Sequence, residues 1–390
     1  MLRLIFFILL AHCSIQSFSQ LNKAESQISI VNLAEGFNNN QKIPLSKIAN
    51  SIKYIPLETT NDNYISQIKK IVIEKNCILV LDEKANKLLL FNLDGHYQCS
   101  IGREGKGPGE YVRITNIEVS PSRNLIYIFD VASAKILTYN FEGEFMGNLR
   151  HPLLGYWVTL LDDKYFVYFD PARSYRYAGG FYKAIITDLN GKIVKKFLRQ
   201  SQSKEEKFKS PCSMQSYAYS YNNSSFYWEV TSDTIFQVTE TLEFFPSRYV
   251  NQGPMSLPKS KMYEARYVME KFSEHSTILT IFETEKFFFA RGITNFQPAA
   301  LLYFKDSKEC YNASNSRGFL INDLDNGPGF WPIGKINDHS IYSAIDPIDL
   351  KDIVSNNKEM QITNSEVILK MANSLQEIDN PIIVILELKN

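Results

Sequence analysis

The sequence ILVLD at residues 78–82 recurs as IYIFD at residues 126–130, which is 48 residues further along the chain. The next segment recurs at the same spacing, because LLLFN at residues 88–92 is matched by ILTYN at residues 136–140. In both copies an acidic residue and a glycine follow, beginning with the pair at residues 94–95. A repeat near this length that is built of short strands is typical of the blades of a β-propeller.

Each repeat predicts four strands. In the first copy, residues 78–81 and 88–91 are continuous apolar runs, as expected for strands covered on both faces. Weak alternation at residues 68–73 predicts the strand before them, and residues 97–101 supply the fourth. The Asp-Gly pair between the last two strands favours a tight hairpin, because glycine readily adopts a positive φ. The unit is therefore a four-stranded antiparallel blade.

Five further units follow this first one along the chain. Their predicted strands lie within residues 117–146, 165–198, 217–250, 278–311 and 319–345. We therefore expect an all-β fold, a six-bladed β-propeller of four-stranded antiparallel blades with small helical insertions.

The helical insertions and the closing strands are predicted from the second half of the chain and its ends. Apolar residues at helical spacing within residues 260–272 predict an amphipathic helix, which either binds a partner or packs on the ring; we favour packing. The chain turns helical again after Pro347. Because an unpaired strand edge is open to association, we expect residues 52–57 and 382–388 to close the ring in the same blade.

The N-terminus predicts a signal peptide. Arg3 is its only charged residue, and the apolar run at residues 4–11 is too short to span a bilayer. Small residues at Ser17 and Ser19 favour cleavage before Gln20. We therefore expect export of the chain.

The signal sequence also bears on membrane attachment and domain organisation. A lipid anchor at Cys13 is disfavoured, because His12 is large and polar where a small residue is required. We expect residues 1–19 to be the signal peptide, residues 20–45 an N-terminal extension and residues 46–390 the propeller. The expected location is the periplasm or the outer cell surface.

Composition excludes several classes of protein. Loss of Arg3 with the signal peptide leaves 41 basic and 42 acidic residues without a basic stripe, which argues against a nucleic-acid partner. No apolar run after the signal approaches the roughly 20 residues of a transmembrane helix. The remaining cysteines form no Cys-x-x-Cys pair, which disfavours a zinc ribbon or a redox motif. We interpret all four as buried small hydrophobic residues: Cys77, Cys99, Cys212 and Cys310.

Three longer motifs resemble a known family. They are YIPLETT at residues 54–60, IGREGKGPGEY at residues 101–111 and NDLDNGPGFWP at residues 322–332. In this order they resemble the exported six-bladed β-propeller family of Bacteroidetes, whose blades are similar to NHL repeats. The resemblance implies the fold and a location in the cell envelope. It carries no established catalytic residues.

The glycine-rich stretch at residues 102–111 is the first candidate ligand site. Such a stretch can cradle phosphate, but no Lys-Ser/Thr pair and no helix follow here. We interpret it as a tight connection between blades, in which glycine permits close backbone approach. Arg103, Glu110 and Tyr111 remain candidates for ligand binding, because connecting loops commonly carry function.

The second candidate site begins at Asp323. The sequence DLDNG starts like a calcium loop but lacks the later ligands, so no cofactor is expected and calcium is disfavoured. Asp323, Asp325 and Trp331 are better suited to a sugar or a peptide. Since the last blade adjoins the first, we expect these residues and the glycine-rich connection to flank one patch. Arg103 would anchor an anionic or hydroxyl group there, and Trp331 would stack on a ring.

Three aspartates recur at the end of the same predicted strand: Asp82, Asp130 and Asp170. On one rim they could bind a cation or a polar ligand. The alternative is that each caps its own turn by accepting backbone N–H bonds, and repetition favours this.

Catalytic motifs are weak in this sequence. No Gly-x-Ser-x-Gly motif is present. The histidines after the signal do not pair at metal-ligand spacing; they are His96, His151, His275 and His339. We therefore predict a binding or scaffolding propeller with a protein, peptide or glycan ligand. The alternative is a lyase or hydrolase acting on glycans or peptides. Buried His, Glu or Arg converging at one end of the channel would favour the enzyme, whereas aliphatic walls with an aromatic rim would favour binding.

Overall fold

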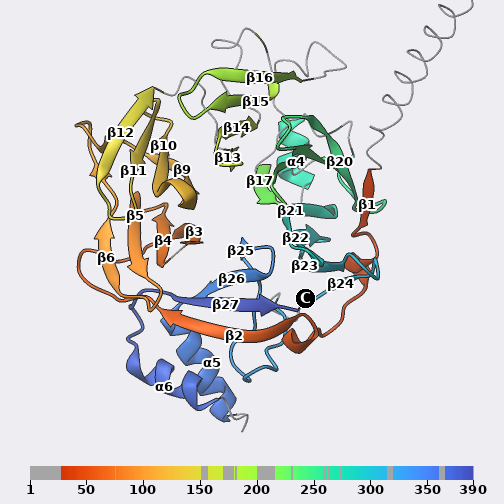
Figure 1. The fold of residues 1–390 in the computed structure, drawn as a ribbon. Helices are drawn as coiled ribbons and strands as arrows, with labels where there is room; N and C mark the ends of the chain where they lie inside the picture. The colour runs from red at the N-terminus through yellow and green to blue at the C-terminus, as the bar shows by residue number, and fades with distance from the viewer. Residues whose placement is uncertain are drawn as a thin grey trace, which may run out of the picture.

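The computed structural model describes residues 28–74, 76–150, 157–169, 180, 182–199, 216–229, 232–258, 261, 264–271, 274–313, 319–359 and 365–389. Six antiparallel sheets of four strands stand around one axis, and one of them carries an additional fifth strand (Figure 1). This arrangement confirms the predicted six-bladed β-propeller.

The first three blades follow the repeat in the sequence. Blade 1 contains β3 (Ile68–Glu74), β4 (Cys77–Asp82), β5 (Lys87–Asn92) and β6 (Tyr97–Ser100). Blade 2 contains β9 (Ile114–Ser120), β10 (Leu125–Asp130), β11 (Lys135–Tyr139) and β12 (Phe145–Arg150). Blade 3 contains β13 (Trp157–Leu161), β14 (Tyr165–Phe169), β15 (Tyr182–Asp188) and β16 (Ile193–Leu198).

The other three blades are less regular in sequence but equivalent in structure. Blade 4 contains β17 (Ser216–Tyr221), β18 (Ser224–Glu229), β19 (Thr234–Val238) and β20 (Phe244–Asn251). Blade 5 contains β21 (Thr277–Glu283), β22 (Phe287–Thr294), β23 (Gln297–Phe304) and β24 (Cys310–Asn312). Blade 6 contains β25 (Gly334–Asn337), β26 (Ser340–Ile345), β27 (Ile382–Leu388) and β2 (Ala49–Pro56).

The chain order gives the ring two distinct faces. Hairpins between the first and second and between the third and fourth strands of a blade lie on one face, which we call the hairpin face. Connections between the second and third strands and from blade to blade lie on the opposite face, the connection face. The glycines of three hairpins have φ of 89° (Gly95), 86° (Gly143) and 81° (Gly191), which agrees with the turns expected from the repeat.

Blade 6 closes the ring with strands from both ends of the chain. β2 pairs antiparallel with β27, so that Ile52 lies opposite Leu386 and Ile55 opposite Ile383. This confirms the predicted closure. β27 is also paired with β26, so both edges of this C-terminal strand are covered.

The segment before β2 wraps around the outside of the ring. β1 (Ser29–Asn32) adds to blade 4 as a parallel strand beside β20. Residues 33–48, which we call the strap, then run along blade 5 and include η1 (Gly36–Asn38) and η2 (Leu45–Lys47). In Figure 1 the strap passes from β1 to β2 beside β24, and Gln41 N donates to Asn312 O at 3.1 Å.

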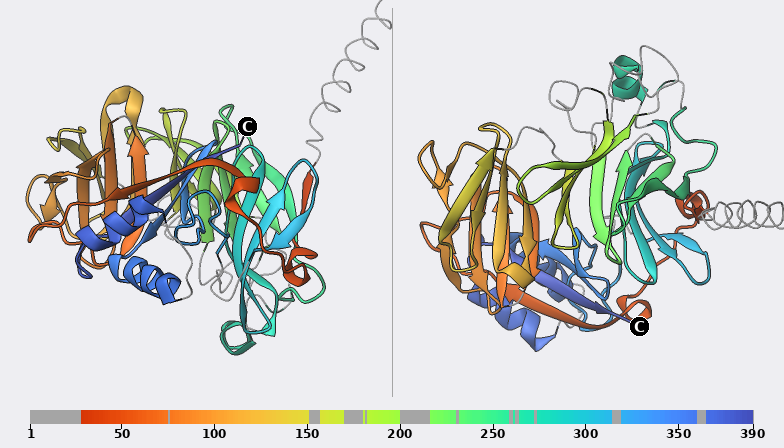
Figure 2. Two further views of the ribbon diagram at one scale, coloured as in Figure 1. Left: turned by 90° about the horizontal axis from the view of Figure 1, so that it is seen from below. Right: turned by 45° about the horizontal axis from the view of Figure 1, so that its top comes forward.

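Three helices depart from the β arrangement. The predicted helix within residues 260–272 is confirmed in a shorter form as α4 (Ala265–Lys271), with Val268 buried. α5 (Pro347–Glu359) and α6 (Glu366–Ser374) lie against each other beside blade 6 (Figures 1 and 2). Their shared core includes Leu350 and Ile368 and reaches Ile382 at the start of β27. No helix in the described part of the chain is long and apolar enough to cross a membrane.

The hydrophobic core lies between neighbouring blades. Phe129 of blade 2 meets Phe166 of blade 3 edge to face, with ring centroids 5.3 Å apart. Phe169 of blade 3 stacks on Tyr227 of blade 4, with centroids 5.0 Å apart. Burial of each such side chain contributes roughly 1.5–3 kcal/mol, so the continuous apolar runs of the sequence hold the blades together.

The cysteines agree only in part with the prediction that all are buried. Cys310 is buried, but Cys77 and Cys99 are half-buried, and all three are free thiols. Cys99 lies on β6, the outermost strand of blade 1, and Cys77 is the first residue of β4. Cys212 lies outside the described residues.

Candidate ligand site in the central channel

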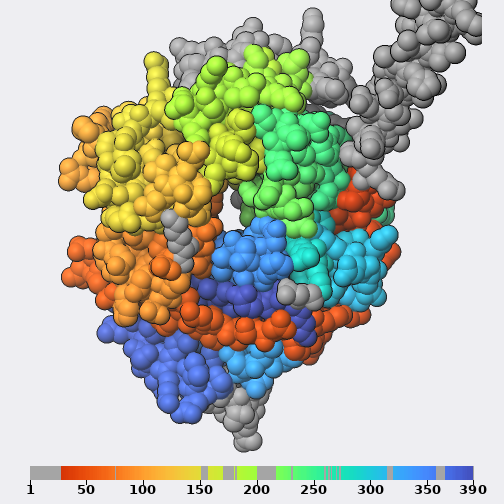
Figure 3. All heavy atoms as spheres, in the orientation of Figure 1, coloured from red at the N-terminus to blue at the C-terminus, as the bar shows by residue number. Residues whose placement is uncertain are grey.

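The central channel contains a cavity between the blades. It has a volume of about 580 Å³ and is lined by all six innermost strands, with Ile71, Asn116, Val158, Ala218 and Phe282 among the residues of blades 1 to 5 and Lys335 from blade 6. Figure 3 shows a narrow opening at the centre of the ring. The cavity is of the size that small-molecule sites usually have.

Backbone groups make the channel polar. Each innermost strand lies at the edge of its sheet, so one side of it has no neighbouring strand. Such an edge presents N–H and C=O groups that require another partner. In blade 1 part of this requirement is met by Tyr342, whose hydroxyl donates to Ile71 O at 3.0 Å and accepts from Ile71 N at 3.3 Å. In blades 2 and 3 part of it is met by Lys70, which donates to Ile117 O at 2.7 Å, and by Asn116, which donates to Val158 O at 2.9 Å. The edge groups that remain can bind water or a ligand rich in hydroxyl or amide groups.

Polar side chains join the innermost strands of neighbouring blades. Lys70 Nζ of blade 1 lies 2.7 Å from Glu118 Oε1 of blade 2, and Glu118 Oε2 accepts from Leu160 N of blade 3 at 3.2 Å. Thr159 Oγ1 also donates to Ser225 Oγ at 2.7 Å, which ties β13 to β18, the second strand of blade 4. These contacts fix the channel wall, because each polar group is held by an adjacent blade.

Aromatic side chains add an apolar surface to this wall. Trp157, Tyr217 and Phe282 line the channel. Trp157 is half-buried, whereas the other two tryptophans, Trp228 and Trp331, are at most 1% exposed. Burial raises the pKa of Tyr217 to about 12, so this side chain is a neutral hydrogen-bonding group at pH 7. Aromatic faces beside hydroxyl and amide groups suit a ligand that has an apolar face and a polar edge.

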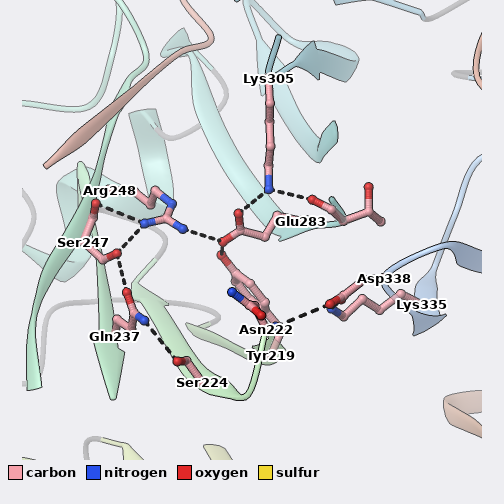
Figure 4. Close-up of polar contacts among 11 residues, drawn as sticks. Tyr219, Asn222, Ser224, Gln237, Ser247, Arg248, Glu283, Lys305, Lys335 and Asp338 are labelled. Carbon is pink, nitrogen blue, oxygen red and sulfur yellow. Dashed lines mark hydrogen bonds and ion pairs between the residues drawn. The ribbon is translucent and has the colours of Figure 1, made fainter. Parts of the chain in front are cut away.

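A largely buried group of charged residues lies at the hairpin-face end of the channel, and its polar contacts are drawn in Figure 4. We call it the charged cluster; its members are Arg248, Glu283, Lys305, Lys335 and Asp338. Glu283 is completely buried, and its Oε2 lies 2.6 Å from Lys305 Nζ. Its Oε1 lies 3.5 Å from an Nη of Arg248. Lys335 Nζ lies 2.5 Å from Asp338 Oδ1.

Two tyrosines complete the surroundings of this cluster. Tyr219 donates its hydroxyl hydrogen to Glu283 Oε1 at 3.1 Å, and burial together with Glu283 raises its pKa well above the ordinary value. The ring of Tyr221 lies under both lysines, 4.2 Å from Lys305 Nζ and 5.1 Å from Lys335 Nζ. No motif in the sequence marks the residues of this site, because they come from four strands (β17, β20, β21 and β25) and two hairpin turns that share no pattern.

The glycine-rich connection is filled by one of its own side chains. Glu110 accepts from Gly107 N at 2.7 Å and from Arg103 Nε at 2.7 Å. These two bonds hold the pKa of the Glu110 carboxyl below its usual range. The Glu110 carboxylate therefore lies where a phosphate would have to bind. Arg103 is largely exposed, whereas Tyr111 is only 1% exposed.

The second predicted segment packs against the closing strand and the strap. Asp323 accepts from Ser46 N at 2.9 Å, and Asp325 accepts from Gly327 N at 2.9 Å. Trp331 is 1% exposed; its ring lies edge to face with Phe289, and the Arg291 guanidinium lies 5.6 Å from its centroid.

The two predicted segments lie on the same face of the ring but at different junctions. One connects blade 1 to blade 2, and the other connects blade 5 to blade 6. The described polar contacts of the six predicted residues stay within each segment and its nearest neighbours. A shared patch with a ligand role for these residues stays a prediction.

The recurring aspartates cap backbone groups. Asp82 accepts from the N–H groups of Lys84 and Ala85 in its own turn, both at 3.0 Å, and from Gln67 N at 3.2 Å. Asp130 accepts from Ser133 N at 3.1 Å and from N–H groups that precede β9. The capping prediction is confirmed for both residues. Asp170 lies outside the described residues.

Glu229 occupies the equivalent place at the end of β18 in blade 4. Only 8% of its side chain is exposed; it is paired with Lys183 and lies 3.6 Å from Arg199. Burial alone would raise the pKa of Glu229, but the two cations hold it below the ordinary value. This site is an ion pair in place of a cap, which explains why the repeat motif is lost in blade 4.

None of the described histidines lines the cavity in the channel. His96 and His339 are exposed and lie near Glu58 and Glu285, respectively, and His275 contacts Tyr267. His151 lies outside the described residues. The charged cluster contains the Glu and Arg expected of an enzyme, but both carboxylate oxygens of Glu283 are engaged, and the residue is sealed from solvent.

The fold and the channel define a class of protein, namely a six-bladed β-propeller with a ligand-sized central cavity. The family model described as a domain of unknown function (DUF4934) matches residues 28–387, and the chain belongs to this family. Together with the structural likeness below, the match confirms the resemblance to an exported six-bladed propeller family.

Three solved structures are similar to the chain. A protein of Bacteroides fragilis NCTC 9343, named only as an exported protein, is 22% identical with a TM-score of 0.73 over 93% of this chain and 100% of that chain. A DUF4221 family member from Bacteroides vulgatus ATCC 8482 is 13% identical with a TM-score of 0.49 over 87% of this chain and 97% of its own. Virginiamycin B lyase from Staphylococcus aureus is 15% identical with a TM-score of 0.39 over 67% of this chain and 72% of its own.

These likenesses bear on the fold alone. The first extends over nearly the whole ring, whereas the other two are too distant to bear on activity. A search of functionally curated proteins found no significant match. The function must therefore be argued from the channel.

Proposed function

We propose that the protein is an exported binding protein of the cell envelope, in the periplasm or on the outer surface, whose central channel holds a small glycan or peptide. The observation that carries the proposal is the cavity of about 580 Å³ to which all six blades contribute. Open strand edges supply hydrogen-bonding groups, and aromatic side chains supply an apolar surface. This combination is typical of sites for small polar ligands.

Binding is favoured over hydrolysis or elimination by the state of the charged side chains. A general base is most often an imidazole or a carboxylate within reach of the substrate. Glu118, which lines the channel, is paired with Lys70 and accepts from Leu160 N, and Glu283 is sealed from solvent. Lyase or hydrolase activity remains the alternative, supported by the convergence of Glu283, Arg248 and Lys305 near the channel.

Trp157 provides a direct test, since it is the one tryptophan of three that lines the channel. Titration of the protein with a panel of oligosaccharides and short peptides should change its fluorescence saturably. Trp157→Phe should lose this signal, while calorimetry still detects the ligand.

A narrowed channel supplies the control. Ser220 is exposed and lines the channel, so Ser220→Phe should narrow the cavity and weaken binding without unfolding the ring. A ligand that binds Ser220→Phe as tightly as the unmodified protein would place the binding site elsewhere. Consumption of a panel member on incubation would support the enzyme.

A further inference from the structure

The charged cluster contains an excess of positive charge. Among the described residues, the three cations Arg248, Lys305 and Lys335 face the two carboxylates of Glu283 and Asp338. Glu285 lies nearby at the rim, but it is 59% exposed and lies beside His339. The buried part of the cluster therefore carries one positive charge that no described carboxylate compensates.

Such an excess is costly inside a protein. Removing a charge from water costs several kcal/mol unless an opposite charge or strong hydrogen bonds compensate it. The cations here are mostly buried, since the side chains of Lys305 and Lys335 are 19% and 15% exposed. Burial lowers the pKa of both lysines, and the neighbouring Arg248 lowers the pKa of Lys305 further. An anion beside them would relieve this cost.

Lys335 connects the cluster to the channel. It lies on β25, the innermost strand of blade 6, and lines the cavity together with Tyr219. An ammonium group has three N–H donors, and within the described residues Lys335 Nζ has Asp338 as its hydrogen-bonding acceptor. Lys305, by contrast, is held by Glu283 and by the backbone carbonyl of Thr284 at 2.6 Å. Lys335 is thus the cation of the cluster that both lines the channel and has donors left for a molecule there.

We propose that the channel ligand bears a carboxylate group, which binds beside Lys335 at the hairpin-face end. The inference rests on the proposed function of the channel and adds the charge of its ligand. The carboxylate would accept from Lys335 Nζ and compensate the extra positive charge of the cluster. The apolar part of the ligand would lie against Phe282 and Trp157, toward the middle of the channel.

The test uses two pairs of probes that differ only in this charge. One pair is an oligosaccharide of uronic acids and the same oligosaccharide with its carboxyl groups reduced to alcohols. The other is a tripeptide with a free C-terminus and its C-terminal amide. In calorimetry the acidic member of one pair should bind about 10 to 100 times more tightly than its neutral partner, as expected for a hydrogen bond to a charged group. The pair that responds identifies a sugar or a peptide as the source of the carboxylate.

Two lysine variants locate the effect. Lys335→Met should abolish the preference for the acidic probe, whereas Lys69→Met should retain it. Lys69 is a matched control, since it also lines the channel but is paired with Glu83 near the connection face. If Lys335→Met does not fold, Lys335→Gln is used instead, because its amide retains a donor for Asp338.

Each outcome is decisive. Equal binding of acidic and neutral probes would overturn the carboxylate proposal. A preference for the acidic probe that persists in Lys335→Met would also overturn it. Either result would leave the proposed binding in the channel intact. Two results would count against the proposed function, and the carboxylate proposal would fall with it. One is a probe that binds Ser220→Phe as tightly as it binds the unmodified protein, and the other is no binding by any of the four probes.

Discussion

The hydroxyl group of Tyr54 donates to Oδ1 of Asp325 at 3.3 Å, across 271 residues of sequence. Asn322 Nδ2 contacts both groups, at 3.1 Å from the Tyr54 hydroxyl and 2.6 Å from Asp325 Oδ1. Tyr54 lies on β2, the closing strand, and the other two lie in the connection between blades 5 and 6. Two of the three motifs that resemble the family therefore meet in space, and their contact fastens the closing strand.

Tyr54→Phe should lower the free energy of unfolding by about 1 kcal/mol, because it removes one hydroxyl from a partly buried network. Urea denaturation measures the change. Tyr97→Phe is the control, since its hydroxyl bonds to Ser100 on the outside of blade 1 and should contribute little. Equal effects of the two substitutions would show that the network does not stabilise the closure.

Asp82→Ala should destabilise the ring by about 2–4 kcal/mol, because the completely buried carboxylate accepts several backbone N–H bonds that would lose their partner. Asp130→Ala should behave similarly. The exposed Asp94→Ala is the control for thermal unfolding. A ligand affinity altered by Asp82→Ala in a protein of unchanged stability would instead assign this carboxylate to a binding site.

Glu229→Gln should show a stability loss that depends on pH. The folded pKa of Glu229 lies below its ordinary value of 4.5, so the ion pair is fully present above about pH 4.5 and is lost as the pH falls through the folded pKa. The variant should therefore be less stable by about 3–5 kcal/mol at pH 7, and this difference should shrink in acid.

Denaturation with urea at pH 7 and pH 3.5 measures this difference. Glu83→Gln, which affects a partly exposed pair with Lys69, should cost less than about 1 kcal/mol at either pH. A loss for Glu229→Gln that does not change with pH would contradict the ion-pair explanation.

Cys310 should report whether the strap is in place. The strap covers this thiol so closely at Gly36 that an added Cβ would collide with Cys310 Sγ. Burial raises the pKa of Cys310 to about 12, so the native thiol should react slowly with iodoacetamide. Gly36→Val should displace the strap and accelerate labelling of Cys310, as measured by mass spectrometry.

The half-buried Cys99 is an internal control, since it lies in blade 1 and its labelling rate should not change. Unchanged labelling of Cys310 in Gly36→Val would mean that the strap does not protect this position.

The two terminal strands should differ in importance. Deletion of residues 381–390 removes β27, which is paired on both sides, and should abolish cooperative thermal unfolding. Deletion of residues 20–32 removes β1, a four-residue parallel strand at the edge of blade 4, and should lower the melting temperature only slightly. A larger loss on removing β1 would contradict closure of the ring by β27.

The architecture could be predicted because local sequence patterns specify its strands and turns. The apolar runs at residues 78–82 and 126–130 became β4 and β10 at equivalent places in successive blades, since each blade must fill the same space between two neighbours. The turns at Gly95 and Gly143 require a positive φ wherever they occur. Blade number and closure follow from this repetition and from the need to cover strand edges.

The candidate site could be predicted only in part. Arg103 and Trp331 stand out in the sequence, but a residue type does not reveal exposure, and Trp331 is buried against Phe289 and Arg291. The channel wall is made of unremarkable residues whose common property is a place on an innermost strand. No local pattern distinguishes Lys335 from the other lysines of the chain.

The sequence by itself therefore determined the repeat, the blades and their closure, because short-range hydrophobic and turn preferences specify strands and hairpins. Only the tertiary structure decided which side chains face the channel and that Glu283, Arg248 and Lys335 converge at one end of it. These residues are tens of positions apart, and their pairing depends on how neighbouring blades pack. Such packing leaves no pattern in the sequence around any of these residues.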